Sequence, residues 1–285
     1  MTAYAEVIGD PIAQSKSPAI HNYWLRKLGL EAEYRACHVA AEGLAGYLAG
    51  RRDDPEWRGC NVTMPHKQAI VPLLDRLEIG AEMVGAVNTV TRRRNGALIG
   101  CNTDGAGFLE PLRSELAQTH LFRMARVLGT GGAARAIVAA LAEQGFVIVL
   151  AGRDRAKARA LLMDIDPERE HHAVDFAHFA ELSDFPFDDR EGCLDLIVNA
   201  SPLGMAGQPP LKFDFGHAPP NSVVYDIVTH PVETEFLKTA LAAGFRTIDG
   251  LAMLIGQAAV AFEKFFGGPP PRDDGDGELR RILTS

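Results

Sequence analysis

Two residue patterns in this chain could carry chemistry: a polar group around one lysine and a glycine-rich turn. Lys67 follows Asn61-Val62-Thr63, so one short turn supplies an amide, a hydroxyl and an amine. A lysine there could hydrogen-bond a substrate oxygen and move a proton, and a carboxylate beside it, for which Asp104 is the candidate, would make an acid/base pair. An isolated lysine is more often a solvated surface charge, so this interpretation depends on its neighbours.

Two further polar clusters fall, like the first, at the ends of apolar strands, where ligands bind in open α/β sheets. One of them is Val87-Asn88-Thr89, followed by Asn102-Thr103-Asp104. The other is Ser15-Lys16-Ser17-Pro18, which has the form of a helix start with Ser17 as N-cap and Pro18 first in the helix. Such a helix N-terminus could hold a carboxylate, although the simpler interpretation is that Ser17 only caps the helix.

The glycine-rich turn lies between an apolar run and a helix predicted over 133–144, and a second apolar run at 146–150 follows. Strand, turn, helix and strand form one βαβ unit, the context that a dinucleotide fingerprint requires. The fingerprint G-x-G-x-x-A falls on Gly129, Gly131 and Ala134. The first glycine permits the turn, the second lets a pyrophosphate approach, and the alanine lets the helix pack closely. A tight turn without a ligand is the alternative.

The elements that must position these residues alternate between strand and helix, which favours a mainly parallel α/β sheet. In the first part of the chain we expect strands at 4–8, 34–39, 84–90 and 98–100, and a helix at 106–117. In the second part we expect strands at 194–198, 222–226 and 245–248 and a long apolar helix at 250–266, while His171 and His172 fall in a charged loop.

Length and composition limit the possible functions. The 285 residues suffice for two domains, and 47% hydrophobic with 23% charged residues is ordinary for a soluble protein. A net charge of −8 without a dense basic run argues against nucleic acid, and no apolar run is long enough for a membrane span. The four scattered cysteines and the nine histidines show no metal-ligand spacing, so we expect reduced thiols, no metal, no signal peptide and a cytoplasmic location.

Seven blocks in order resemble the shikimate dehydrogenase family. The blocks are Ser15-Lys16-Ser17-Pro18 with His21-Asn22, Asn61-Val62-Thr63 with Pro65 and Lys67, Ala86 to Thr89, Asn102 to Gly105, Gly129 to Arg135, Asn199 to Met205, and Asp249-Gly250-Leu251 through Gln257. They cover about residues 4–266, and seven ordered blocks are far more specific than any one.

The resemblance implies an N-terminal substrate domain, residues 1–105, completed by a C-terminal helix within about 249–285, and a Rossmann cofactor domain at 106–248. The active site would lie in the cleft between them. The implied reaction is the reversible reduction of 3-dehydroshikimate to shikimate with hydride from NADPH, in aromatic amino-acid (chorismate) biosynthesis. The protein would act on a small molecule as a monomer or homodimer.

The family's site residues carry over to matching positions. The resemblance implies that Lys67 and Asp104 form the acid/base pair, although it leaves open whether Lys67 alone or the pair moves the proton. The implied substrate ligands are Ser15, Ser17, Asn61, Thr63, Asn88, Gln257 and Thr229. The implied cofactor ligands are Gly129, Thr130, Gly131, Gly132, Ala133, Gly152, Arg153, Asp154, Lys157, Ile227 and Gly250.

Two positions depart from the family pattern. Thr229 stands where the family usually has a tyrosine that touches the substrate, and it is too short for the same contact. After the second Rossmann strand, Arg153, Arg155 and Lys157 suit the 2′-phosphate of NADP, whereas Asp154 would repel it and could hold the free ribose hydroxyls of NAD. We expect NADP, with NAD possible.

Three alternatives stay open. An NAD-using quinate/shikimate dehydrogenase often has threonine at the position of Ser17, so the serine favours shikimate while Asp154 weakly favours NAD. A catalytically silent relative that binds a nucleotide or a shikimate-like acid for regulation would not need both Lys67 and Asp104. A Rossmann protein with an unrelated substrate, such as a folate, fits the fingerprint but not the serine cluster.

Overall fold

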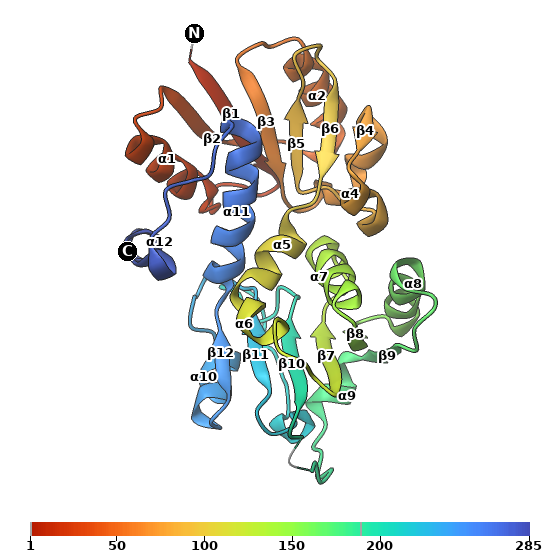
Figure 1. The fold of residues 1–285 in the computed structure, drawn as a ribbon. Helices are drawn as coiled ribbons and strands as arrows, with labels where there is room; N and C mark the ends of the chain where they lie inside the picture. The colour runs from red at the N-terminus through yellow and green to blue at the C-terminus, as the bar shows by residue number, and fades with distance from the viewer. Residues whose placement is uncertain (1, 189) are drawn as a thin grey trace. The chain divides into compact units, whose positions relative to one another are not determined.

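The chain forms two compact units in the computed structural model, which describes residues 2–188 and 190–285 (Figure 1). The first unit contains Met1–Gly107 and Ile255–Ser285, and the second contains Phe108–Leu254. Two helices carry the chain across the boundary, α5 (Asp104–Leu109) on the way out and α11 (Gly250–Phe266) on the way back. Each unit is built around one six-stranded sheet.

The sheet of the first unit has the order β2-β1-β3-β5-β6-β4. Its strands are β1 (Ala3–Gly9), β2 (Ala32–His38), β3 (Trp57–Val62), β4 (Arg76–Leu77), β5 (Thr89–Arg92) and β6 (Leu98–Cys101). The pairs β1–β2, β1–β3 and β4–β6 are parallel, and β5 is antiparallel to both neighbours. The helices are α1 (Ser17–Leu28), α2 (Leu44–Arg52), α3 (His66–Ala69), α4 (Ile79–Val84) and α12 (Gly277–Thr284).

The sheet of the second unit is parallel throughout, in the order β12-β11-β10-β7-β8-β9. Its strands are β7 (Phe122–Leu128), β8 (Val147–Gly152), β9 (His172–Asp175), β10 (Cys193–Asn199), β11 (Val223–Asp226) and β12 (Arg246–Ile248). Its helices are α6 (Arg113–Leu116), α7 (Gly132–Glu143), α8 (Arg155–Ile165), α9 (Phe176–Ala180) and α10 (Glu235–Ala242). This is the Rossmann order, with its switch point between β7 and β10, so the predicted α/β class and Rossmann unit are confirmed.

Apolar side chains explain why these elements form. β1 is buried from its second residue onward, as expected of a strand covered on both faces. In α7 the buried residues Ala134, Ile137, Val138 and Leu141 repeat at helical spacing and face the core of the second unit. α1 ends where Gly29 takes a left-handed conformation (φ +63°) and its N–H bonds back to the carbonyls of Arg26 and Leu25.

Several local predictions are wrong. Residues 84–88 are not strand, because α4 ends at Val84 and β5 begins only at Thr89. The helix predicted over 106–117 is broken into α5, a 3-10 turn (Glu110–Leu112) and α6, since Pro111 has no N–H for the helical ladder. His172 lies in β9 rather than in a loop. The sequence did not reveal α12.

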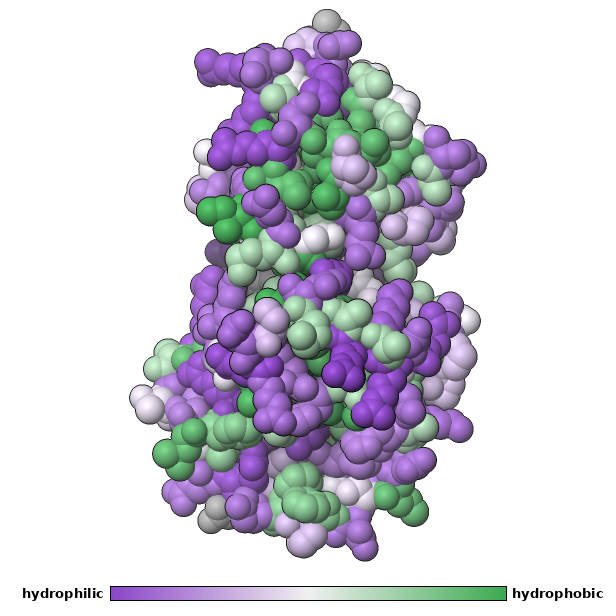
Figure 2. All heavy atoms as spheres, turned by 90° about the vertical axis from the view of Figure 1, so that its right-hand side faces the viewer, coloured by the Kyte–Doolittle hydropathy of each residue, from purple (hydrophilic) through white to green (hydrophobic). Residues whose placement is uncertain are grey.

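The surface is mixed in polarity. Figure 2 shows one face, on which hydrophilic side chains predominate and hydrophobic ones form small areas between them. Across the described residues, no helix is long and apolar enough to cross a membrane.

Candidate functional site

The lysine of the first polar cluster lies in a short, well-anchored helix of the first unit. α3 follows β3 after one turn, and the His66 ring lies 2.6 Å (Nε2) from the carbonyl of Val39, which is in the range of a hydrogen bond. The carbonyl of Lys67 accepts the N–H of Val87 at 2.8 Å. The Lys67 ammonium forms an ion pair with Asp104, and the two side chains are only 15% and 6% exposed. This lysine is therefore not a solvated surface charge.

Asn88 orients the carboxylate of this pair. Its Nδ2 donates to Oδ1 of Asp104 at 2.8 Å and to the hydroxyl of Thr103 at 2.9 Å, while the Oε1 of Gln257 lies at 3.4 Å. Its Oδ1 accepts the N–H of Thr103 at 2.8 Å. The structure thus brings together four predicted residues, from α3, the turn before β5, the start of α5, and α11.

Asn61, at the end of β3, adjoins this group but uses its polar atoms within the protein. Its Nδ2 donates to the hydroxyl of Thr89 at 2.9 Å and to the carbonyl of Asn88 at 3.2 Å, and its Oδ1 accepts from Tyr34. Thr63 follows, half-buried, with its N–H bonded to the carbonyl of Ile8. Asn61 thus supports Asn88 from behind.

The serine cluster begins α1, but not as predicted. Ser17 is the first residue of the helix instead of its N-cap, the N-cap is Lys16, and no side chain caps the helix. The hydroxyl of Ser15 receives the N–H of Ser17 at 3.3 Å. The turn at 15–17 places the hydroxyl of Ser15, two residues before Ser17, where it accepts the backbone N–H of Ser17. Ser17 is buried and Ser15 half-buried, at a helix end that favours an anion.

The glycine turn of the second unit lies at the switch point of the sheet. Gly129 has φ +130°, and a Cβ there would stand 2.5 Å from the carbonyl oxygen of Ala200, so only glycine fits. Gly131 is exposed with open space around it, and it precedes the first residue of α7. Free backbone N–H groups at the start of α7 suit a pyrophosphate. Thr130, Gly132 and Ala133 complete the turn and the helix start.

The residues after β8 have distinct roles. Asp154 caps α8, and its Oδ1 accepts the N–H groups of Ala156 at 2.9 Å and Lys157 at 3.2 Å. Arg155 donates to the carbonyl of Ala173 in β9. Arg153 and Lys157 are exposed, which leaves their charges available to a phosphate. Gly152 packs closely on Thr130, because a Cβ there would lie 2.9 Å from the threonine methyl.

The loop after β11 is held by a buried carboxyl. Asp226 accepts from the side chains of Asn199 and Thr234 and from the N–H of Val228. Burial raises the pKa of Asp226 to about 6. Gly250 starts α11 against this loop, since a Cβ there would stand 2.3 Å from the carbonyl oxygen of Val228 and 2.6 Å from that of Ile227. Thr229 follows, half-buried.

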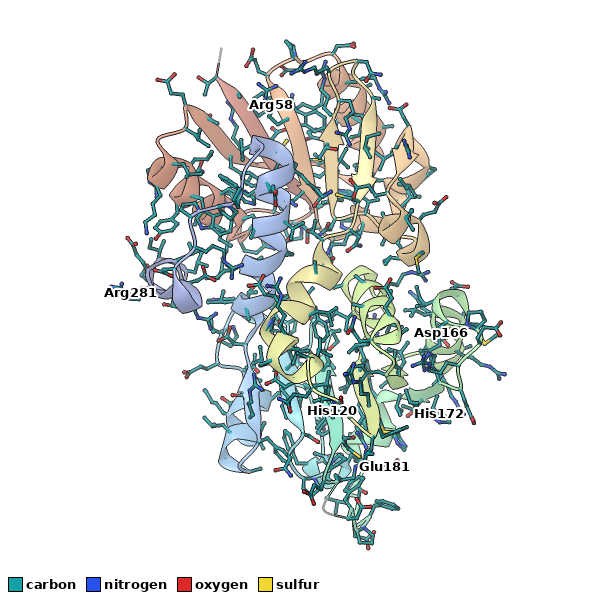
Figure 3. All side chains as sticks on the ribbon, in the orientation of Figure 1. Arg58, His120, Asp166, His172, Glu181 and Arg281 are labelled. Carbon is teal, nitrogen blue, oxygen red and sulfur yellow. The ribbon has the colours of Figure 1, made fainter. Side chains whose placement is uncertain are left out.

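Metal-binding groups do not converge. In 2–188 and 190–285 no three His, Cys, Asp or Glu side chains are placed to hold a metal ion. Figure 3 shows His120 apart from His172 within the second unit. All four cysteines are free thiols.

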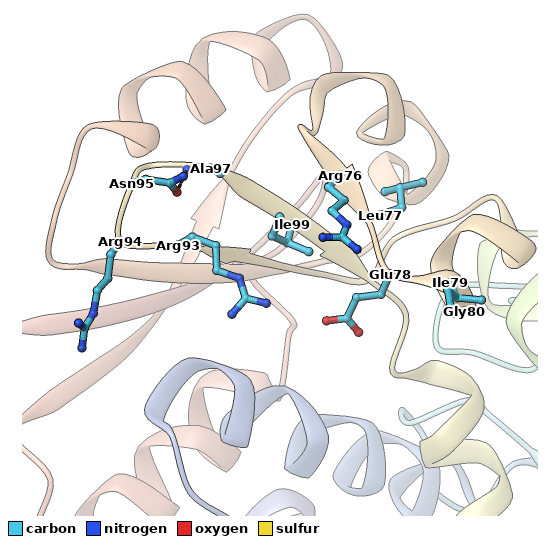
Figure 4. Close-up of a pocket in the computed structure, with 10 residues that line it drawn as sticks. All are labelled: Arg76, Leu77, Glu78, Ile79, Gly80, Arg93, Arg94, Asn95, Ala97 and Ile99. Atoms are coloured by element: carbon cyan, nitrogen blue, oxygen red, sulfur yellow. Dashed lines mark hydrogen bonds between the residues drawn. The ribbon is translucent and has the colours of Figure 1, made fainter.

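A pocket of about 970 Å³ lies elsewhere on the first unit (Figure 4). It is formed by β4, the start of α4 and the turn from β5 to β6, and three of its lining residues are Arg76, Arg93 and Arg94. None of the predicted site residues lines it. Glu78, which also lines the pocket, is paired with Lys264. The candidate site therefore rests on side-chain geometry and not on this cavity.

The sequence pointed to most of these residues but missed Tyr34, Thr89 and Thr103 as separate participants. Thr89 and Thr103 lie inside matched blocks, and their polar neighbours were the available signal. Tyr34 lies in a strand far from any block and gave no signal.

The fold and its two sites are those of an α/β dehydrogenase with a Rossmann unit. Residues 7–90 match the substrate binding domain of shikimate dehydrogenase. A shikimate dehydrogenase (NADP(+)) of Sphingopyxis alaskensis is 50% identical over 285 residues, covering 99% of this chain and 97% of that protein. The chain belongs to the shikimate dehydrogenase family.

Solved structures agree with this assignment. The shikimate 5-dehydrogenase of Thermus thermophilus, in complex with NADP(H) and shikimate, is 33% identical with a TM-score of 0.79, covering 99% of this chain and 98% of that one. The quinate dehydrogenase of Corynebacterium glutamicum, in complex with NAD, is 30% identical with a TM-score of 0.78, covering 99% and 98%.

Proposed function

We infer that this protein is an NADP-dependent shikimate dehydrogenase that catalyses the reversible reduction of 3-dehydroshikimate to shikimate, a step toward chorismate and the aromatic amino acids. The observation that carries the proposal is the ion pair between half-buried Lys67 and buried Asp104, oriented by Asn88. It occurs in a chain whose relative at 50% identity is a shikimate dehydrogenase (NADP(+)).

The first unit binds the substrate. Ser15 and Ser17, at the start of α1, hold the substrate carboxylate, because a helix N-terminus and two hydroxyls compensate its charge. The overall charge of −8 does not attract this anion, so binding depends on these local groups and Lys67. The ring hydroxyls are bound by Thr63, Asn88 and Gln257, while Asn61 supports Asn88 from behind. Thr229 stands where the family usually has a longer side chain that touches the substrate.

Lys67 and Asp104 handle the proton. The nicotinamide of NADP supplies or accepts the hydride when it is bound. In reduction, the Lys67 ammonium donates a proton to the substrate oxygen, and in oxidation the amine takes it back. Asp104 holds the ammonium in place through its Oδ2, while Asn88 fixes the other carboxylate oxygen. Positioning and proton transfer together account for the chemistry required of the protein.

The second unit binds the cofactor. The pyrophosphate would be held by Gly129 to Ala133, and Gly152, Ile227 and Gly250 would line the remainder of the cofactor site. Arg153 and Lys157 bind the 2′-phosphate of NADP. Asp154 does not oppose this binding strongly, because its carboxylate is already bonded to two N–H groups of α8.

An assay of the purified protein tests the proposal. Shikimate and quinate would each be offered with NADP and with NAD, and the absorbance of the reduced nicotinamide followed. We expect the highest kcat/KM with shikimate and NADP. Preference for quinate and NAD would replace the proposal with the activity named for the Corynebacterium relative, and no turnover in a folded protein that binds NADP would support the silent regulatory alternative.

The proposed function also leads to an expectation for the location and oligomeric state of the protein. We expect a protein that acts on small molecules in the cytoplasm, as a monomer or a homodimer.

A further inference from the structure

A continuous path of hydrogen bonds runs through the first unit from β2 to the Lys67–Asp104 pair. It begins at the hydroxyl of Tyr34, which donates to Oδ1 of Asn61 at 2.5 Å. Asn61 donates to the hydroxyl of Thr89 at 2.9 Å, and Thr89 donates to Oδ1 of Asn88 at 2.9 Å. Asn88 then donates to Asp104 at 2.8 Å.

The direction of every donor in this path is fixed. The carbonyl of Asn88 only accepts, so Asn61 must turn its amide nitrogen toward it and its oxygen toward Tyr34. The backbone N–H of Thr103 only donates, so Asn88 must turn its amide oxygen toward it and its nitrogen toward Asp104. All side-chain donors therefore point toward the carboxylate, an arrangement in which each bond polarises the next.

Tyr34 is held so firmly that it can act as the fixed end of this path. Its ring stacks on that of His21, with centroids 4.0 Å apart and planes within 3° of parallel. Its backbone N–H and carbonyl are both bonded to the side chain of Asn22. Burial raises the pKa of Tyr34 above its usual range, so the hydroxyl keeps its proton and donates.

We propose that Tyr34 is a positioning residue for the reaction. Its hydroxyl sets the orientation of Asn61 and Asn88, and through them the orientation of Asp104. This inference rests on the proposed dehydrogenase function. Tyr34 touches neither substrate nor cofactor in this account. Loss of its hydroxyl leaves Oδ1 of Asn61 buried without its donor, so the asparagine and the path beyond it lose their unique orientation.

The test compares Tyr34→Phe with Tyr47→Phe. Both substitutions remove one oxygen from a tyrosine of the first unit that donates to a buried acceptor, since Tyr47 donates to Glu6 at 2.7 Å. The hydroxyl of Tyr47 thus donates to Glu6, which is not a member of the path. Steady-state kcat and KM for shikimate and NADP would be measured with the thermal midpoint of each protein.

We expect both variants to lower the thermal midpoint, and only Tyr34→Phe to lower kcat, by about tenfold, with both KM values within about twofold of wild type. A Tyr34→Phe protein with wild-type kcat, or a Tyr47→Phe protein with an equal loss of kcat, would overturn the positioning role while leaving the proposed function intact. Absence of turnover in the wild-type protein would overturn both.

Discussion

The lysine site of the first unit and the glycine turn of the second are stabilised by different parts of the chain. Around Lys67 and Asp104, buried side chains bond to one another, and each depends on a neighbour for its orientation. At the glycine turn the backbone itself fills the space, with Gly129 in close approach to Ala200. We therefore expect that removal of side-chain atoms impairs the lysine site, whereas addition of atoms impairs the glycine turn.

Two glycine substitutions separate folding from binding in the second unit. Gly129→Ala places a Cβ 2.5 Å from a carbonyl oxygen at φ +130°, so we expect a loss of about 3 kcal/mol in unfolding free energy. Gly131→Ala meets no atom within 4 Å, so stability should change by less than about 0.5 kcal/mol.

The same pair of variants tests cofactor binding. Gly131→Ala should still weaken NADP by about tenfold or more, because the methyl group occupies the approach of the pyrophosphate. Urea unfolding and calorimetric titration with NADP check both statements. A Gly131→Ala protein with unchanged NADP affinity would show that the phosphates do not approach this turn.

Asn88→Ala should damage the first site by removal of atoms. It leaves the N–H of Thr103 and the hydroxyl of Thr89 without their buried acceptor and Oδ1 of Asp104 without the amide donor of Asn88. We expect a loss of about 3 kcal/mol in unfolding free energy and a fall in kcat of about 10²-fold. The exposed Asn95, changed to alanine, is the control for both measurements, and an active Asn88→Ala protein would contradict the orienting role.

The stability of the protein should depend on pH through His21 of the first unit. His21 is fully buried, and burial lowers the pKa of its ring from 6.5 to about 3. The unfolded chain therefore binds a proton below pH 6.5 that the folded chain does not, and stability falls as the pH drops from 6.5 toward 3. At pH 5 this loss is about 2 kcal/mol relative to pH 7.

His21→Phe should remove that part of the pH dependence, as measured by urea unfolding at pH 7 and pH 5. His230→Gln, at an exposed position, should leave it unchanged. If wild type and His21→Phe lost the same unfolding free energy between pH 7 and pH 5, the His21 ring would have to be protonated in the folded protein as well.

Asp154→Thr should give the smallest effect. Threonine retains an oxygen for the α8 cap, so stability should change by less than about 0.5 kcal/mol, whereas Asp154→Ala should lose about 1 kcal/mol. Removal of one exposed negative charge beside Arg153 should raise the preference for NADP over NAD a few-fold. A selective, large loss of NAD affinity would instead show that Asp154 binds the ribose hydroxyls.

Sequence patterns predicted the second site better than the first. The glycine turn is contiguous in the chain, and its strand and helix contexts are strongly apolar, so the local pattern was sufficient. Residues 84–90 were wrongly predicted as one strand. Val84, Val87 and Val90 are all buried, but they lie in succession at a helix end, in a turn and in a strand. Short apolar runs do not distinguish these cases.

The first site depends on the topology of the sheet, which no local pattern contains. Lys67 and Asp104 were expected to pair, yet their contact requires β3 and β6 to flank β5. The hydrogen bond from Tyr34 to Asn61 could not be predicted from the sequence, since only the register of β2 and β3 against β1 brings the two residues together. The bonds from Asp154 to α8 were likewise not evident from its neighbours in the sequence alone.

The proposed function requires that Lys67, whose side chain is only 15% exposed, moves the proton at a site prepared for shikimate. Single-turnover mixing of Lys67→Met with shikimate and NADP measures this most directly, with dissociation constants for both ligands determined on the same protein. Lys238→Met, at an exposed lysine of α10, is the matched control. We predict a 10²–10⁴-fold slower formation of NADPH, roughly the contribution of one acid/base group, with NADP affinity retained and the control unaffected. A rate within about twofold of wild type would contradict the account, because this magnitude excludes Lys67 from proton transfer.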